Sequence, residues 1–486
     1  MISQDAWNLE LDFSSPKPFQ LEPVQEHLST DTGLLLFRQL DEQLGLTEAF
    51  ALQLNDLRYD PEHPILEMVR SRVYGILAGY EDQNDHDALR SDAVFKLLAG
   101  RLPDEDDLAS QPTLSRFENA VTPRDLLNLE DWFLQRFVDS FEQPPSEITL
   151  DIDPFDDPAH GQQQLVLFHG FYNQYQYLIR VITCAENDAV VMPVLLHGTA
   201  HAALGADEDL RRVVTALRDK FPDVQIHVRA DSGFAVPRMY ETCEALQVNY
   251  TIAIGMNSVL KRQSATLLAE AVEQYEQTNQ PQRLFTVFAY QAGSWPQSRQ
   301  VVVKCEAGPN GTNRRAVVSN RPGITVLPGG VYDEYADRGE SENRNKELKC
   351  ELCADRLSDH RYMANCFRMF LHCLAYSLLL TMRRHIASPP DEPCLPDPPC
   401  PHLEPVEVPH EIPAEASTGR TRRDQFNRRR QADPLGEGHA STWRMMLIKV
   451  AARITVQARR VRVFLSGSWP FLPYFHEVGQ ALLTGS

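Results

Sequence analysis

Apolar residues in the first third of the chain recur with helical spacing. Between Thr32 and Phe141 they return every three or four positions, first as leucines and then as a series of Ile, Met and Val. This periodicity is typical of amphipathic helices. It predicts a helical N-terminal domain over 31–145, after an irregular leader at 1–30, with helices at about 34–46, 65–77, 86–99 and 123–140.

Beyond Glu147 the pattern changes to the two-residue alternation of strands. Three strand-like runs come first, followed by a helix, a strand, a second helix and a fifth strand. This order favours an α/β, ribonuclease-H-like catalytic core, whose first part covers 146–257. The expected elements are strands at 148–153, 164–168, 177–182, 224–231 and 250–254, and helices at 206–220 and 235–246.

The next segment interrupts this rhythm. Residues 258–333 contain strand-like runs and turn signals, and we interpret them as a β-rich insertion in the core. A second part of the core then follows at 334–386, with a long helix at about 361–384. Residues 387–440 form a linker that is first rich in proline and then basic, and 441–486 form a C-terminal element.

The charge of the chain is uneven. Its 486 residues carry a net charge of −20, which taken alone argues against binding nucleic acid. From Ser417 onward, however, about twelve Arg and Lys stand against four Asp and Glu. A local basic patch attracts phosphates within a Debye length whatever the total charge. The densest run, which we expect to contact DNA, is Arg420, Arg422, Arg423, Arg428, Arg429 and Arg430.

Several features predict a location in the cytoplasm. No run approaches the roughly 20 consecutive apolar residues of a membrane span, so no membrane is expected among the partners. The N-terminus lacks the basic and apolar regions of a secretory signal. Nine cysteines are too sparse for a disulfide scaffold and indicate reduced thiols.

The segment from Tyr335 to Lys349 carries an unusual polar stripe. Tyr335, Arg338, Glu342 and Lys349 stand at offsets of 0, 3, 7 and 14. A helix places such residues within an arc of roughly 60°, a face that usually belongs to apolar side chains. A carboxylate between a phenol and two cations suits the joint binding of a metal ion and phosphates. Glu340 and Glu347 are alternatives, but neither falls on the stripe.

Two aspartates at strand ends could complete a metal site with Glu342. Asp153 ends the first predicted strand and Asp231 the fourth, and these strands are neighbours in a ribonuclease-H-like sheet. Asp151 lies on the same strand face as Asp153 and remains an alternative, although Asp153 is more accessible at the strand end. Three carboxylates of this kind are ligands that Mg²⁺ prefers, with Mn²⁺ also possible. We therefore predict Asp153, Asp231 and Glu342 as catalytic and metal-binding residues.

These residues resemble a known family. The chain is similar to DDE-type transposases of bacterial insertion sequences that bear the Tyr-(2)-Arg-(3)-Glu-(6)-Lys signature, which Tyr335, Arg338, Glu342 and Lys349 match without a gap. The blocks at 151–153 and 229–233 resemble the family's first two acidic motifs. The segments 79–86 and 110–119 resemble its N-terminal region.

The resemblance implies Mg²⁺-dependent endonuclease cleavage and strand transfer in DNA transposition. The partners would be double-stranded DNA, both terminal inverted repeats and target DNA, and a second copy of the chain in a DNA-bound homodimer. A bacterial, nucleoid-associated location in the cytoplasm would follow, and the helical N-terminal domain would serve DNA binding or assembly. Tyr335, Arg338 and Lys349 would contact phosphates. Trp295, the only tryptophan in the insertion, is the candidate for stacking on a flipped base. The alternative is a catalytically silent DNA-binding relic or regulator.

Overall fold

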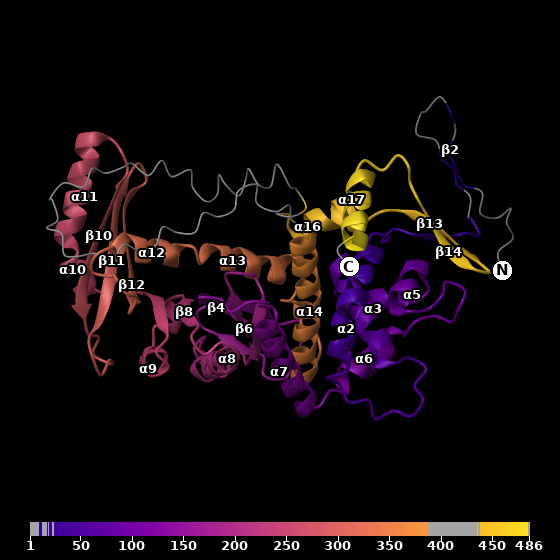
Figure 1. Ribbon diagram of the computed structural model, residues 1–486, viewed down its shortest axis with the longest axis horizontal. Helices are drawn as coiled ribbons and strands as arrows, with labels where there is room; N and C mark the ends of the chain where they lie inside the picture. Colours follow the sequence, from indigo (N-terminus) through magenta and orange to yellow (C-terminus); the bar gives the residue numbers. More distant parts are fainter. Residues whose placement is uncertain are drawn as a thin grey trace.

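The computed structural model describes residues 9–11, 17, 19–21, 24–386, 435 and 438–484. The fold is a mixed α/β arrangement built on one large mixed sheet (Figure 1). The basic run with Arg420, Arg422, Arg423, Arg428, Arg429 and Arg430 lies outside the described residues.

The long strand β4 is at the centre of the predicted core. It pairs antiparallel with β6 and parallel with β8, β8 pairs parallel with β9, and β7 lies antiparallel on the outer edge of β6. Across the sheet the strand order is therefore β7-β6-β4-β8-β9. The predicted first and fourth strands, 148–153 and 224–231, correspond to β4 and β8, and these two are neighbours as expected. The strands are β4 (Glu147–Pro158), β5 (Leu167–His169), β6 (Gln174–Cys184), β7 (Val190–Leu196), β8 (Gln225–Ala230) and β9 (Asn249–Ile254).

The insertion extends this sheet instead of forming a separate layer. β12 pairs antiparallel with β9, and β11 and β10 follow it outward, so that the described sheet has nine strands. Two helices that the sequence analysis did not predict, α10 and α11, precede these strands. The elements are α10 (Ser258–Gln263), α11 (Ala265–Thr278), β10 (Gln282–Tyr290), β11 (Arg299–Gly308) and β12 (Gly311–Ser319).

Helices cover both faces of the sheet (Figure 1). On one face α7, α8 and α9 bury apolar side chains against the alternating apolar residues of β4, β8 and β9. On the other face α12 and α13 cross the strands, with α13 above β4. The helices are α7 (Pro123–Asp139), α8 (Ala206–Lys220), α9 (Pro237–Ala245), α12 (Pro328–Ala336) and α13 (Gly339–Lys346).

The N-terminal helices share a core with the rest of the chain. α14 (Tyr362–Ile386) stands between them and the sheet, and its buried residues belong to the same apolar cluster as theirs (Figure 1). The predicted segment 31–145 is helical, but it has no separate core. Its helices before α7 are α1 (Leu34–Leu44), α2 (Leu46–Ala51), α3 (Ile65–Ala78), α4 (His86–Leu89), α5 (Ala93–Ala99) and α6 (Gln111–Asn119), with a 3₁₀ turn at Gln83–Asp85.

The two ends of the chain meet. β3 pairs antiparallel with β13, which pairs with β14, so that leader and C-terminal element form one small sheet. The leader is not wholly irregular, because three short strands occur in it. The elements are β1 (Leu9–Leu11), β2 (Phe19–Leu21), β3 (His27–Ser29), α16 (Ala440–Trp443), β13 (Ala452–Gln457), β14 (Arg460–Leu465) and α17 (Leu472–Thr484), with a π-helical turn at Arg444–Ile448.

One described helix, α14, is long and apolar enough to cross a membrane. Of its most apolar window, however, 89% is buried inside the protein. That burial is what the central helix of a helical core shows, and α14 packs against α1, α3, α6 and α7.

A buried ion network joins three of these helices. Glu118 of α6 is fully buried and accepts hydrogen bonds from Arg72 of α3, at 2.7 Å, and from Arg368 of α14. Glu118 lies in the segment 110–119 that resembles the family's N-terminal region. At this position the segment holds the fold together.

We expect Glu118→Gln to lower the free energy of unfolding by about 3 kcal/mol, because it replaces the carboxylate shared by two buried guanidiniums with a neutral amide. Urea denaturation followed by tryptophan fluorescence measures this change. Glu130→Gln, which breaks the partly exposed pair with Arg212, is the matched control and should cost less than about 1 kcal/mol. Equal losses in the two variants would contradict the role of Glu118.

Candidate active site

The parallel pairing of β4 with β8 sets the spacing of two predicted site residues. Ile152 is paired with Ala230 at the end of the ladder. The next residue, Asp153, lies within β4, which does not end there as predicted but continues to Pro158, and Asp231 directly follows β8. Both carboxylates therefore leave the sheet at the same level from adjacent strands. Asp231 also begins a 3₁₀ turn, where its Oδ1 accepts a hydrogen bond from the backbone N–H of Gly233 at 2.8 Å.

Glu342 reaches the same place from the helices above the sheet. Asp337 and Arg338, between α12 and α13, keep right-handed helical backbone angles, so the helical path continues through them. Tyr335, Arg338 and Glu342 consequently share one face, as the spacing predicted. The predicted single helix does not persist to Lys349, because residues Glu347–Glu351 form a wider π-helical turn. Such turns are common at functional sites.

Arg338 connects the helix to the strand. Its Nη1 lies 3.2 Å from Oδ1 of Asp153, and its Nη2 forms an ion pair with Glu342. The aromatic ring of Tyr335 lies 5.7 Å from the guanidinium carbon. Only 10% of the Arg338 side chain is exposed, against 55% of Glu342.

The three carboxylates influence one another electrostatically. Burial raises the pKa of Asp153 to about 6; the Arg338 charge opposes this rise, and the charges of Asp231 and Glu342 add to it. Burial also raises the pKa of Asp231, with a further contribution from Glu342. Asn345, which the sequence analysis missed, donates a hydrogen bond from Nδ2 to Oδ2 of Asp153 at 3.2 Å. Asn345 stands three residues after Glu342, which on a helix places it near the polar stripe. That spacing could have identified it as a site residue.

Asp151 and Asp153 have different partners. Asp151 is buried and makes a two-pronged ion pair with Arg229, with both N–O distances at 2.7 Å. Arg229 also donates to the backbone carbonyl of Glu334 at 2.6 Å, which ties the sheet to α12. Asp151 thus has its oxygens engaged in a structural pair, whereas Asp153 faces the other carboxylates. This contrast favours Asp153 as the first acidic residue of the site.

The donor chemistry of the site fits a hard divalent cation. Arg338 bridges Asp153 and Glu342, Asp231 follows the strand beside Asp153, and Asn345 hydrogen-bonds Asp153. Carboxylate and amide oxygens are ligands of the kind that Mg²⁺ and Mn²⁺ take. Among the described residues, no group of three or more His, Cys, Asp or Glu is already arranged around a common metal position. The guanidinium of Arg338 pairs with two of the three predicted carboxylates, Asp153 and Glu342.

The remaining predicted phosphate-binding residues lie in different surroundings. Lys349 donates to Oδ1 of Asp156 on β4 at 2.6 Å, three residues after Asp153, and therefore borders the site. Trp295 is only 5% exposed and packs edge to face against Tyr240 and Tyr290. In this position it is a core residue with no open face for a base.

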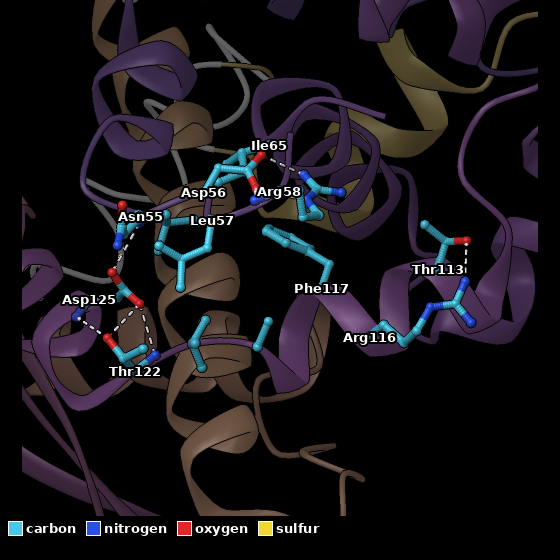
Figure 2. A pocket seen from close by; sticks show the side chains of 13 residues that line it. Asn55, Asp56, Leu57, Arg58, Ile65, Thr113, Arg116, Phe117, Thr122 and Asp125 are labelled. Carbon is cyan, nitrogen blue, oxygen red and sulfur yellow. Dashed lines mark hydrogen bonds and ion pairs between the residues drawn. The ribbon is translucent and has the colours of Figure 1, made fainter. Parts of the chain in front are cut away.

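A separate apolar pocket lies in the N-terminal helices (Figure 2). Its volume is about 300 Å³, and Leu54, Leu57, Ile65 and Phe117 are among its lining residues. In Figure 2 the side chain of Arg116 turns away from the pocket and donates to Thr113 at 3.0 Å. None of the predicted catalytic residues lines this pocket.

Comparisons with known proteins identify relatives of the chain. A family model described as "Transposase DDE domain group 1" matches residues 16–391. Among solved structures, the cryo-EM structure of the piggyBac transposase synaptic complex with hairpin DNA matches at 12% identity and a TM-score of 0.40, over 74% of this chain and 77% of that chain. A TM-score of this size supports no conclusion about the function of this chain. No curated protein matches it significantly.

The raised pKa of Asp153 predicts a pH-dependent effect of Asp153→Asn in metal-free protein. The pKa of Asp153 in the folded protein, about 6, lies above its usual value of 3.8. Ionisation of Asp153 therefore destabilises the fold, and this cost grows as the pH rises from about 3.8 to about 6. Asp153→Asn should therefore stabilise the protein by about 1–2 kcal/mol at pH 7 and have little effect near pH 3.5. Urea denaturation at several pH values tests this, with Asp219→Asn on α8 as the control for losing one negative charge. A pH-independent difference would contradict the prediction.

Proposed function

The chain belongs to the transposase DDE domain family, and we propose that it cuts DNA at the ends of a mobile element and joins those ends to target DNA. The observation that carries this proposal is that Arg338 pairs with both Asp153 and Glu342, while Asp231 lies beside Asp153 at the end of the β4–β8 ladder. These residues stand on two strands and a helix that are far apart in the sequence. The charges of Asp231 and Glu342 add to the raised pKa of Asp153, an arrangement that has no evident structural purpose and suits cation binding.

We also propose that the sheet is a ribonuclease-H-like core. The support is its central strand order, β7-β6-β4-β8-β9, with β6 antiparallel to β4 and with β8 and β9 parallel to it. Asp153, within β4, and Asp231, directly after β8, lie side by side at the end of the β4–β8 ladder. The β-rich insertion then separates Asp231 from Glu342 along the chain without separating them in space.

Asp153, Asp231 and Glu342 would hold the divalent ions, Mg²⁺ or Mn²⁺. Bound there, such ions would activate the attacking oxygen and stabilise the leaving oxygen of the phosphodiester. Asn345 would keep the Asp153 carboxylate oriented through its hydrogen bond. The buried Asp151–Arg229 pair would fix the strand beneath it.

Arg338, Lys349 and Tyr335 would position the DNA strand. The guanidinium of Arg338 can bind two phosphate oxygens at once, while Lys349 offers a point charge and Tyr335 a hydroxyl. The proposed partners are double-stranded DNA, at terminal inverted repeats and at the target, and a second copy of the chain, since two DNA ends must be joined together. A location in the bacterial cytoplasm, at the nucleoid, follows from that substrate.

We expect Asp231→Ala or Glu342→Ala to lower Mg²⁺-dependent nicking of a duplex carrying the element end by about a thousandfold or more. DNA affinity should stay the same or rise slightly, because each change removes a negative charge near the phosphates. A gel assay of nicking and fluorescence anisotropy of a labelled duplex measure the two quantities. Glu208→Ala, on the exposed face of α8 and paired with Arg238, is the matched control and should cut normally.

Other outcomes of this experiment would assign other functions. Retained cleavage in Asp231→Ala or Glu342→Ala would overturn the site. End-specific binding by the unaltered protein, without cleavage in Mg²⁺ or Mn²⁺, would identify a silent DNA-binding relic or regulator. Cleavage without preference for terminal inverted repeats would identify a general nuclease.

A further inference from the structure

The guanidinium of Arg338 lies between two of the three carboxylates that are proposed to bind metal. It pairs directly with Asp153 and Glu342, which are 189 positions apart in the sequence. Its charge also acts on Asp231, whose pKa it lowers against the effect of burial. A single internal cation therefore neutralises part of the charge of all three proposed metal ligands.

The hydrogen-bonding groups of Arg338 are only partly used in this position. Its two terminal nitrogens contact carboxylates, but its Nε is buried and has no hydrogen-bond partner among the described residues. A buried N–H without an acceptor costs about 1–3 kcal/mol. A new acceptor within reach, such as a phosphate oxygen, would therefore offer the Arg338 side chain a position of lower free energy.

We propose that Arg338 is an internal counter-cation that competes with divalent metal for Asp153 and Glu342, and that a DNA phosphate ends this competition by drawing the guanidinium away. The inference rests on the proposed function and adds to it a means of regulation. A divalent ion and the guanidinium would compete for the negative charge of the same two carboxylates, because two positive centres a few ångströms apart repel each other. Without DNA the carboxylates are thus neutralised from within, and metal loading is weak.

This arrangement couples the two ligands of the site. If a phosphate withdraws Arg338, DNA tightens metal binding, and by linkage metal tightens DNA binding by the same factor. The nuclease centre would then assemble only on its substrate. Arg338 is a positioning residue in this scheme, because it acts on the metal through Asp153 and Glu342.

The test is a Mn²⁺ titration of the full-length protein without DNA, followed by electron paramagnetic resonance of the free ion. Arg338→Ala and Arg338→Gln should both bind Mn²⁺ about tenfold more tightly than the unaltered protein, since a competing charge within a few ångströms is gone. Arg338→Lys keeps a positive charge and should stay within about threefold of the unaltered protein. Arg356→Ala, which removes an exposed guanidinium paired with Glu81, is the matched control and should change nothing.

A gain of affinity separates this role from damage to the fold, because a distorted site would bind Mn²⁺ more weakly. Asp231→Asn, titrated in parallel, distinguishes the two levels of the argument. If Asp231→Asn abolishes the Mn²⁺ site while Arg338→Ala and Arg338→Gln bind no better than the unaltered protein, the counter-cation role is overturned and the proposed function stands. If Asp231→Asn leaves Mn²⁺ binding intact, the proposed metal site itself is wrong.

Discussion

The structure depends on one electrostatic constraint at the end of the β4–β8 ladder. Because Ile152 is paired with Ala230, the aspartates that follow them emerge side by side, partly removed from water. Like charges in such a place repel, and burial adds to the cost of ionisation. The groups around them partly offset that cost. Arg338 places a positive charge beside Asp153, Asn345 donates a hydrogen bond to Asp153, and the Gly233 N–H donates one to Asp231.

Two kinds of acidic residue can be distinguished around this point. Asp151 and Glu347 are buried and matched to arginines: Asp151 pairs with Arg229, and Glu347 with Arg383. Burial alone would raise the pKa of Glu347, but hydrogen bonds from Arg383 hold it below its usual value. Asp153 and Glu342 instead share one guanidinium, and their charge is only partly balanced. This shortage of cations marks the candidate site, because a purely structural cluster gains nothing from leaving carboxylates unmatched.

The sequence was informative where a local pattern decides the structure. Alternation predicted β4, β6, β8 and β9, but it missed β7 and placed the strand at 164–168 mostly before β5. The spacing of Tyr335, Arg338 and Glu342 correctly gave them a common face. The sequence was less informative where contacts between residues far apart in the chain determine the structure. The sequence around Trp295 does not distinguish a base-stacking tryptophan from a core one. Only its contacts with Tyr240 and Tyr290 show that it is a core residue. Helix α11 buries little more than Ala271, so its periodicity was too weak to separate it from the strands that follow.

The exposure of the site residues bears on how Arg338 could serve both carboxylates and DNA. Glu342 is 55% exposed, whereas Asp153 is 14% exposed and Arg338 only 10%, so the site opens on the side of Glu342. A phosphate that approaches from this side meets the carboxylate before the guanidinium. To bind a phosphate as proposed, Arg338 would have to turn outward, and in turning it would release Asp153. Because the Arg338 side chain is buried, its contact with the carboxylates and the proposed contact with DNA would exclude each other.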